Sequence, residues 1–569
     1  MREWWKRSPN IGRKEVLIVS AAAILISIIQ FFPLVTHLSS HIATDLGDPL
    51  SQSWQIAWGG HALLHQPLAF WQSNQFWPAK DTLAFSDALV GLAPFGMLGG
   101  GASGAVRNYN LALLFAFSLA FVAVYLLARE FDIPPWAAAI AGAAFAWSPF
   151  RLWQAGHMHV VSSGGIALAL FLLLRGYRRQ DPKLIIFGWL AASWLATIGF
   201  TLGIQLDYLL LVLGAVGAIC WWRAGKPRPT ANVAWATAAG IGEFLFVTWL
   251  VTRPYLRVTN EYPHVHRTIS AVMNLSPGPL AFLTPPRQSL LWGDLTAGIR
   301  PAKKIAEVEG SLYPGIVAFA LALVGLGWKR VPKALRIGLG FAVLAFASLS
   351  LGVHRGSLGH LMPYRFLYDF MPGWDTMRTP GRLQTLTTLA LALLAAMGAA
   401  RLGEWVKDRR GQKVAGFALA GVVLLVLLDG SGLVYPQPAV PMPPAVLASV
   451  KGPYLQLPVE ASNNRRYLLW STDGFPKMVN GRSSFTPPIY RQIVRASKTF
   501  PSASSIRQLE ALGVHRVIVH TEFNSMPLLD EPKAHGMTWA QATAQPYPTA
   551  VGVHRRLLKP LVIYDFGKP

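Results

Sequence analysis

Eleven apolar runs, separated by short polar connections, constrain the fold of this chain more than any other feature of its sequence. The first run covers residues 16–35 and is about 20 residues long, which is enough to cross a bilayer as a helix. Basic residues precede it, and its apolar core is longer than that of a cleaved signal peptide. We therefore expect an uncleaved first helix with a cytoplasmic N-terminus. The other runs cover residues 108–129, 136–149, 159–175, 184–201, 205–222, 232–252, 313–328, 335–352, 383–402 and 414–432.

The composition favours a membrane environment. Hydrophobic residues make up 52% of the chain and charged residues only 14%, which is too little charge to cover a soluble surface. The net charge is +24, but the basic residues lie between the apolar runs and form no solvated basic stripe, so we expect no nucleic-acid partner. The single cysteine, Cys220, excludes an internal disulfide and a zinc knuckle.

Basic residues predict the orientation of the runs. Most connections that would face the cytoplasm carry clustered Lys and Arg, as the positive-inside rule requires. These clusters are Arg178/Arg179/Lys183, Arg223/Lys226/Arg228, Lys329/Arg330/Lys333 and Lys407/Arg409/Arg410/Lys413. The same count places loops 37–107, 253–312 and 353–382 in the periplasm. We therefore predict an α-helical polytopic protein of the bacterial inner membrane, with about eleven transmembrane helices within residues 1–432.

The tail, residues 433–569, has a different character. It is less apolar than the rest and rich in Pro, Ser and Arg. Residues 504–512 show a helical pattern, and residues 514–520 alternate as a strand does. We predict a small C-terminal α/β domain in the periplasm.

The first loop carries three aspartates in positions that suit helix starts. Asp48 precedes Pro49 and suits an N-cap, and Asp87 suits the cap of a second helix over 88–97. Trp54 and Trp58, one turn apart, favour a first helix that lies in the membrane interface and reaches about residue 64. Capping and solvation explain Asp45, Asp48 and Asp87 without any function. A carboxylate held at the membrane surface is also well placed to meet an amphiphilic substrate.

At these residues the sequence resembles the GT-C superfamily of membrane glycosyltransferases, closest to bacterial members of the protein O-mannosyltransferase and aminoarabinose-transferase group. The resemblance covers most of the chain. It rests on Asp45-Leu-Gly-Asp48, Tyr125-Leu-Leu-Ala-Arg129-Glu130-Phe131, the stretch from Ser148 to His159, Glu309-Gly310-Ser-Leu-Tyr-Pro314-Gly315, Pro372 to Arg382 and Leu512 to His520. It implies a polyprenyl-phosphate- or diphosphate-linked sugar donor and inversion at the anomeric carbon.

Such a transfer needs a base for the acceptor hydroxyl, and a carboxylate within hydrogen-bond reach can serve. We expect Asp48 in this role and Asp45 next. As an N-cap, Asp48 would have its carboxylate partly occupied by backbone N–H groups and so be a weaker base, which keeps Asp45 open.

The leaving phosphate needs cationic or hydrogen-bonding partners. His157 and His159 are candidates to contact donor or acceptor, although interfacial histidines bonded to loop backbone are the plainer explanation. In bacterial oligosaccharyltransferases the corresponding stretch has an acidic metal-binding motif, which His157 and His159 replace here. No cofactor is certain. A divalent metal stays open, with Asp45 or Asp87 as a third ligand.

Four arginines are expected at headgroup depth. Arg253 and Arg257 flank Pro254-Tyr255 just past the seventh run, and Arg378 and Arg382 flank Thr379-Pro380-Gly381 before the tenth. Ordinary headgroup contact accounts for any one of them, but arginine forks also bind phosphate. Arg378 is the best phosphate candidate, because Pro380 and Gly381 stiffen the turn beside it.

The leading hypothesis is a glycosyltransferase that moves a sugar to a periplasmic lipid, glycan or protein acceptor, with membrane lipids as its surroundings. A transporter or flippase for a lipid-linked glycan is the alternative, although no inverted repeat is visible. A membrane scaffold whose tail binds an envelope partner is a third. Flux measured in liposomes would separate the first two.

Overall fold

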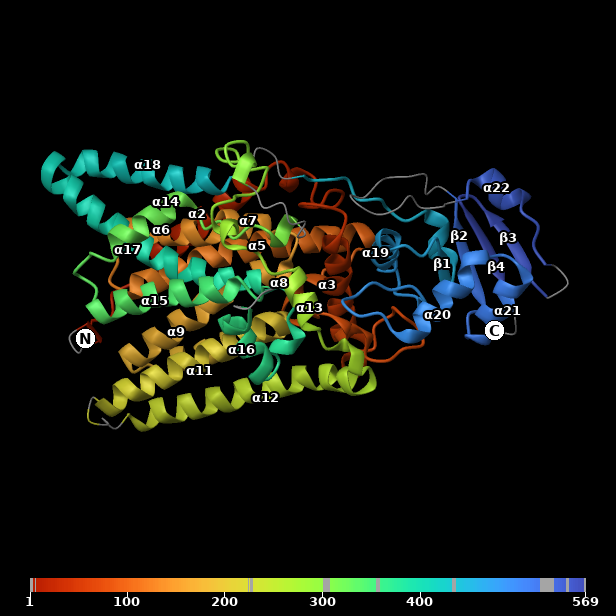
Figure 1. Cartoon of the computed structure of the whole chain (residues 1–569), viewed down its shortest axis with the longest axis horizontal. Helices are drawn as coiled ribbons and strands as arrows, with labels where there is room; N and C mark the ends of the chain where they lie inside the picture. Colours follow the sequence, from red (N-terminus) through yellow and green to blue (C-terminus); the bar gives the residue numbers. More distant parts are fainter. Residues whose placement is uncertain are drawn as a thin grey trace. The chain divides into compact units, whose positions relative to one another are not determined.

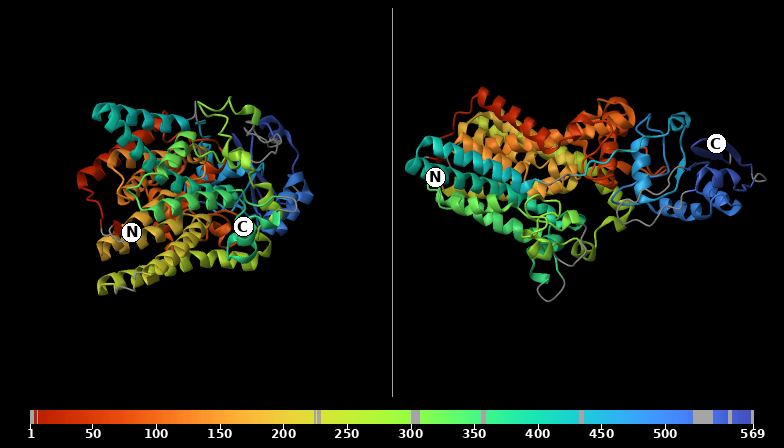
Figure 2. Two further views of the ribbon diagram at one scale, coloured as in Figure 1. Left: turned by 60° about the vertical axis from the view of Figure 1, so that its left-hand side comes forward. Right: turned by 90° about the horizontal axis from the view of Figure 1, so that it is seen from above.

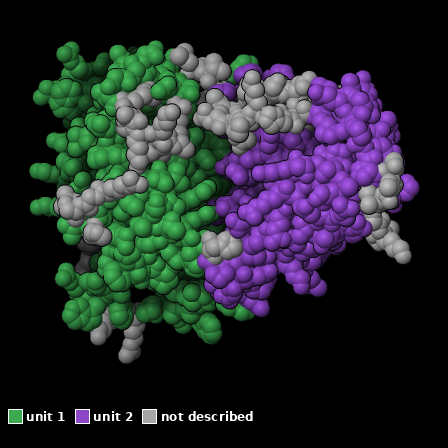
Figure 3. Space-filling view, turned by 45° about the vertical axis from the view of Figure 1, so that its right-hand side comes forward, with its two compact units in different colours: residues 1–32, 113–252, 264–435 green, residues 33–112, 253–263, 436–569 purple. Residues whose placement is uncertain are grey.

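The computed structural model describes residues 4–5, 7–223, 225, 229–299, 307–354, 359–431, 436–521, 537–548 and 552–566. Lys226 and Arg228 of the predicted basic clusters, and the first residues of the predicted tail, lie outside these ranges. The described chain forms two compact units (Figure 3). Unit 1 comprises residues 1–32, 113–252 and 264–435, and unit 2 comprises residues 33–112, 253–263 and 436–569.

Unit 1 is a bundle of helices that run side by side (Figures 1 and 2). Two long helices, α5 (Gly101–Glu130) and α12 (Ala231–Glu261), begin or end in unit 2. The other helices of the unit are α2 (Arg13–Gln30), α6 (Pro135–Ala146), α7 (Pro149–Trp153), α8 (Met158–Val161), α9 (Gly164–Arg179), α10 (Pro182–Ile198), α11 (Phe200–Arg223), α13 (Ile269–Asn274), α14 (Ile316–Gly325), α15 (Lys333–Ser350), α16 (Pro363–Phe370), α17 (Gln384–Arg410) and α18 (Gln412–Gly430).

Each of the eleven predicted apolar runs lies on a helix of this set. Among the described residues, seven helices are long and apolar enough to cross a membrane. They are Gly101–Glu130, Met158–Arg179, Phe200–Arg223, Ala231–Glu261, Lys333–Ser350, Pro380–Arg410 and Gln412–Gly430. The chain is thus a mostly helical protein suited to a multi-pass membrane location, while the count of eleven spans stays a prediction.

Helix α17 is the centre of the bundle, and the apolar window of its span is entirely buried. It packs against α14, α15, α6 and α18. Glycine makes the α14 contact possible, because a Cβ on Gly398 would lie 1.8 Å from the carbonyl oxygen of Leu321. Small residues at helix crossings let backbones approach closely, which is how helices associate where lipid offers little hydrophobic drive.

Unit 2 joins the first loop to the tail. Its helices are α3 (Asp48–His65), α4 (Ala93–Gly96), α19 (Ala461–Trp470), α20 (Pro488–Ala496), α21 (Ala503–Ala511) and α22 (Trp539–Ala544). One apolar core contains Trp54 and Trp58 of α3, Tyr467 and Trp470 of α19, and Ile518 of the sheet. Because Trp54 and Trp58 are buried in this core, they do not anchor α3 in a membrane interface as the sequence predicted.

The sheet of unit 2 has the order β1-β2-β4-β3 (Figure 1). Its strands are β1 (Leu455–Leu457), β2 (Arg516–His520), β3 (His554–Leu558) and β4 (Leu561–Asp565). Strands β1 and β2 are parallel, and the other pairs are antiparallel. The helix predicted over 504–512 and the strand over 514–520 are both confirmed, as α21 and β2. The periplasmic location of this α/β part stays a prediction.

Two predictions about helix starts in the first loop are wrong. Asp48 is the first residue of α3, its N-cap is Gly47, and no side chain caps the helix. The helix predicted over 88–97 with Asp87 as its cap is instead a short 3₁₀ turn, Val90–Leu92, followed by α4. Asp87 caps neither element, because Leu89 and Leu92 occupy the two N-cap positions.

Candidate functional site

Asp48 presents its carboxylate at the surface of unit 2. The side chain is 51% exposed, and its Oδ1 lies 3.2 Å from Nη2 of Arg465 on α19. This contact forms because α19 packs along α3 within the shared core. The carboxylate is therefore exposed to solvent and paired with a cation. Asp48 is thus not the N-cap of α3, and its role as the base stays a prediction.

Asp45 is also exposed, but its carboxylate is turned toward the backbone. Its Oδ1 accepts a hydrogen bond of 2.6 Å from the N–H of Gly47. The buried hydroxyl of Tyr109 on α5 interacts electrostatically with both Asp45 and Asp48.

Arg465 was not identified from the sequence as a site residue. It precedes Arg466 in the tail, and α19 carries Asn463 and Asn464 as well. The Arg465 side chain is 15% exposed, and burial lowers the pKa of the neighbouring Arg466. The sequence offered one signal, an Asn-Asn-Arg-Arg run on an otherwise apolar helix, but no pattern linked that run to Asp48.

Asp87, Arg253 and Arg257 make contacts that differ from those of Asp45 and Asp48. Asp87 is half-buried, and its backbone oxygen accepts a hydrogen bond from Nε2 of Gln55 at 2.9 Å. Arg253 and Arg257 were expected just beyond a span, but both lie inside α12, which continues to Glu261. Arg257 holds Asp81 through two bonds, with Nε 2.8 Å from Oδ2 and Nη2 3.0 Å from Oδ1. Its fork is therefore occupied, whereas Arg253 is exposed.

Unit 1 contains a second polar centre around Arg382. Nη2 and Nε of Arg382 lie 2.7 Å and 3.1 Å from Oε1 of Glu309, and Nη1 lies 2.5 Å from Nε2 of His159. Arginine has only donors, so Nε2 of His159 accepts and the ring is neutral with its proton on Nδ1. In this centre Arg382 contacts both His159, another predicted site residue, and Glu309, to which the sequence assigned no role.

Glu309 is almost completely buried, with 6% of its surface exposed. Burial alone would raise the pKa of its carboxyl, but the charge of Arg382, followed by His157 and the Arg382 hydrogen bond, brings that pKa below its ordinary value. The ring centroid of His157 is 5.9 Å from that of His159. A cavity of about 10 Å³ between His159, Arg382, Gln205 and Thr385 has room for about one water. The centre encloses little free space beside His159 and Arg382.

Arg378 differs from Arg382 in exposure. It is exposed, and in the part of the chain that the structure describes it has no hydrogen-bond or ion-pair partner. Burial, and then the charge of Arg378, lowers the pKa of the nearby Arg267. Asp375 fixes the same loop, because its Oδ2 lies 2.7 Å from Nδ1 of His266. Of the two arginines in this segment, Arg378 is the one whose guanidinium is left for an anion.

Arg151 orders the segment that carries the two histidines. It is fully buried, and its guanidinium donates to the carbonyls of Ala146 and Val161 and to the hydroxyl of Ser163. The group also lies over the ring of Phe145, at 4.6 Å from the centroid. These bonds hold α7 and α8 as one turn, and so fix His157 and His159.

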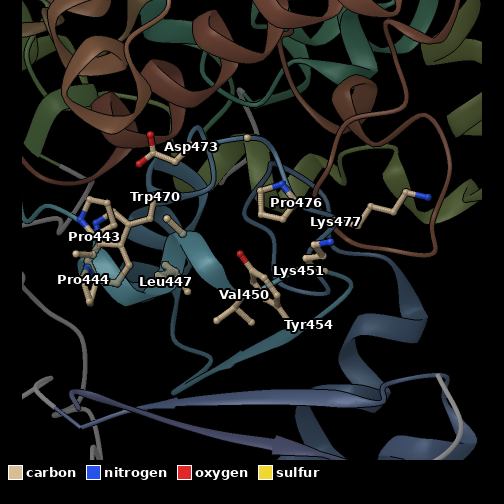
Figure 4. A pocket seen from close by; sticks show the side chains of 14 residues that line it. Pro443, Pro444, Leu447, Val450, Lys451, Tyr454, Trp470, Asp473, Pro476 and Lys477 are labelled. Carbon is tan, nitrogen blue, oxygen red and sulfur yellow. The ribbon is translucent and has the colours of Figure 1, made fainter. Parts of the chain in front are cut away.

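A metal site finds no support in the described ranges, where no three His, Cys, Asp or Glu side chains come together to hold an ion. A cavity of about 490 Å³ lies in the tail part of unit 2 (Figure 4). Trp470 lies beside Pro443 on one side, and Lys451 and Lys477 lie on the other (Figure 4). None of the predicted site residues lines it.

Three solved structures are similar to this chain in fold. Arabinofuranosyltransferase AftD from Mycobacteria aligns with a TM-score of 0.53 and 15% identity, over 99% of this chain and 42% of that chain. The archaeal oligosaccharyltransferase AglB from Archaeoglobus fulgidus gives 0.44 and 15%, over 89% and 69%. ArnT from Cupriavidus metallidurans gives 0.38 and 14%, over 96% and 97%.

Of these three, AftD has the highest TM-score, and its likeness shows that the chain shares the fold of this arabinofuranosyltransferase, which agrees with the predicted GT-C-like fold. No curated protein matches the chain in sequence. A family described as "Domain of unknown function (DUF6311)" matches residues 21–431. Since that match covers well over half of the 569 residues, the chain belongs to the DUF6311 family.

Proposed function

We propose that the protein is a membrane glycosyltransferase that moves a sugar from a polyprenyl-phosphate- or diphosphate-linked donor to a periplasmic lipid, glycan or protein. The observation that carries the proposal is the GT-C-like fold, together with an exposed Asp48 carboxylate at the start of an ordered helix. AftD and AglB are described as an arabinofuranosyltransferase and an oligosaccharyltransferase, and AglB was solved with a dolichol-phosphate. The activities of these two proteins support the class of reaction, and the bound dolichol-phosphate supports the class of donor.

In the proposed reaction the acceptor hydroxyl oxygen attacks the anomeric carbon as the bond from that carbon to the phosphate oxygen breaks. The hydroxyl proton passes to the Asp48 carboxylate, and the lipid phosphate leaves with the electron pair. The displacement inverts the anomeric carbon. Asp45 is the second candidate for the base, because its Oδ1 is already bonded to the Gly47 N–H.

We propose Arg465 as the residue that orients Asp48. An ion pair with Arg465 fixes the direction in which the Asp48 carboxylate meets an acceptor hydroxyl. The pair is 51% exposed on the aspartate side, so an acceptor hydroxyl has access to it.

For the donor phosphate we propose Arg378, with Arg253 as the second exposed arginine. The Arg378 guanidinium has no partner among the described residues and can form two charge-assisted hydrogen bonds to a phosphate. Arg382 and Arg257 are less suited, because their forks are occupied by Glu309 and Asp81. His157, His159 and Asp87 stay as weaker proposals for substrate contact.

We also propose that the protein lies in the bacterial inner membrane with its N-terminus in the cytoplasm and the α/β part in the periplasm. The clustered Lys and Arg residues of the predicted cytoplasmic connections support this orientation. Cysteine labelling of Lys498→Cys with a membrane-impermeant reagent in intact cells tests it.

The test of the function is transfer from a purified polyprenyl-phosphate sugar by the full chain in nanodiscs. Asp48→Asn is expected to lose about 10²–10⁴-fold in rate. Asp294→Asn, an exposed aspartate of the second loop, is the matched control and keeps full activity. If Asp48→Asn and Asp45→Asn both fold and both transfer at the wild-type rate, the proposal fails.

A further inference from the structure

Helix α16 has two apolar faces, and the described residues of the protein cover only one of them. On the inner face, Tyr364 is 1% exposed and its hydroxyl donates to the carbonyl of Met377 at 3.2 Å. The Tyr368 hydroxyl donates to the carbonyl of Arg267 at 2.5 Å. These contacts, and the Tyr364 ring 5.5 Å from Trp374, fix the helix against unit 1.

The outer face is aromatic and open. Phe366 is 55% exposed and Phe370 is 69% exposed, and their rings lie 5.1 Å apart, one helical turn from each other. Leu361, just before the helix, is 77% exposed. Large apolar side chains gathered on one face of a short helix mark a surface that contacts something apolar.

Charged residues flank the exposed aromatic residues in α16 and in the loop that follows it. Arg365 and Asp369 form an ion pair along the helix at 2.6 Å, and the exposed Arg378 follows in the same loop. An apolar stripe beside basic residues is the pattern of a helix that lies in the surface of a bilayer, with its rings among the acyl chains and its cations at the headgroups.

The neighbour of α16 supplies the second argument. Helix α16 packs against α15, and only 6% of the apolar window of α15 is buried. A spanning helix with so little protein cover presents its side chains to lipid. Since α16 follows the end of α15 and packs on it, the open face of α16 lies where that lipid meets water.

We propose that α16 is an interfacial helix whose Leu361, Phe366 and Phe370 insert into the bilayer surface, with anionic lipid headgroups beside Arg365 and Arg378. The occupant of the face is thus the membrane itself, not a second copy of the chain or another protein. The proposal does not depend on glycosyl transfer.

Site-specific fluorescence tests the proposal in the full chain. Because the sequence has one cysteine, a Cys220→Ser background lets Phe366→Cys and Phe370→Cys each carry a single environment-sensitive label. The protein is placed in nanodiscs of phosphatidylcholine and phosphatidylglycerol, with or without lipids that carry a nitroxide on the acyl chain. Phe341→Cys on α15, at a position 71% exposed, is the lipid-facing control, and Lys498→Cys is the aqueous control.

Quenching of both labels by nitroxide lipid, with a loss of fluorescence comparable to that at Phe341 and protection from aqueous iodide, supports the proposal. Quenching by iodide alone, as at Lys498, overturns it, because the face is then in water. Protection from both quenchers also overturns it, because protein then covers the face. Elution profiles of the labelled variants confirm that each is folded.

Discussion

Asp48 and Arg465 are 417 positions apart in the sequence and form an ion pair with Oδ1 and Nη2 at 3.2 Å. The pair ties the first residue of α3 to the middle of α19. Exposed ion pairs contribute at most about 1 kcal/mol to stability, so the contact is better suited to direct a carboxylate than to hold the fold.

Replacing Arg465 by Gln is therefore expected to separate activity from stability. We predict a loss of transfer rate of roughly tenfold, because the carboxylate loses its orientation, with a stability change below about 1 kcal/mol. Rates from a lipid-linked sugar and thermal unfolding of the same preparations check it. Arg507→Gln, an exposed arginine on α21 of the same unit, is the control. A rate equal to wild type would remove Arg465 from the mechanism.

The helices show how much of the fold could be predicted from the sequence. Every predicted apolar run lies on a helix, because a long apolar run in lipid has to satisfy its backbone groups within the helix itself. The ends of the helices were harder to predict. Gly101 begins α5 seven residues before the predicted run, and α12 continues through Pro254 to Glu261. Hydropathy weakens at these ends although the backbone stays helical.

The site was predictable only in part, because its contacts join distant segments. Residue types identified Asp48, His159 and Arg382, but nothing in their local sequence indicated Arg465 or the bonds from Arg382 to Glu309. The capping role predicted for Asp48 was wrong because Asp48 is already the first helical residue, and Gly47, with φ −91° and ψ −115°, is the N-cap. The Asp48–Arg465 pair depends on the packing of α3 on α19. Hydrophobic periodicity within each segment does not predict that packing.

The Glu309–Arg382 pair should matter for stability, in contrast to the exposed pair. Glu309→Gln leaves Arg382 buried without its countercharge, and we predict destabilisation of about 3–5 kcal/mol. Denaturant unfolding in mixed micelles measures it. Asp369→Asn breaks the exposed pair with Arg365 and should cost less than about 1 kcal/mol. Equal effects of the two substitutions would show that burial of Glu309 is not decisive.

Glycine at the crossing of α14 and α17 allows a matched test of the bundle. A Cβ on Gly398 would lie 1.8 Å from the Leu321 carbonyl oxygen, whereas a Cβ on Gly421 of α18 meets nothing within 4 Å. We predict that Gly398→Ala destabilises the protein by about 1–3 kcal/mol through overpacking, and that Gly421→Ala leaves it unchanged or slightly more stable. The unfolding midpoints of the two variants measure this difference. An unchanged midpoint in Gly398→Ala would contradict the close approach of α14 and α17.

Substitutions of Arg378 and Arg382 should change different properties: the KM for the lipid donor in the first case and the stability of the protein in the second. Loss of a charge-assisted contact from Arg378→Gln is expected to raise the KM for the lipid donor roughly 10- to 100-fold without loss of stability. Arg382→Gln should lower stability instead, because it leaves Glu309 buried without its partner. Lys329→Gln, an exposed lysine in another connection, is the control for net charge. An unchanged KM in Arg378→Gln would refute the phosphate role.

His520, in strand β2, provides a prediction about pH. Burial lowers the pKa of this imidazole to about 3, its Nε2 lies 2.8 Å from Oε1 of Gln456, and its ring stacks on Tyr467. The folded sheet holds the neutral ring, while the unfolded chain binds a proton below the ordinary pKa of about 6.5. Stability is therefore full above about pH 6.5 and falls toward pH 3 by about 1.4 kcal/mol per pH unit.

Hydrogen exchange of the β2 and β4 amides between about pH 7 and about pH 4.5, corrected for intrinsic rates, measures this slope. In His520→Gln the titrating group is gone while a side chain able to bond Gln456 remains, so the slope from this site should disappear. His554→Gln, an exposed histidine of β3, should keep the wild-type slope. If His520→Gln loses protection with falling pH as steeply as wild type, protonation at another residue opens the sheet, and the buried imidazole does not limit its stability in acid.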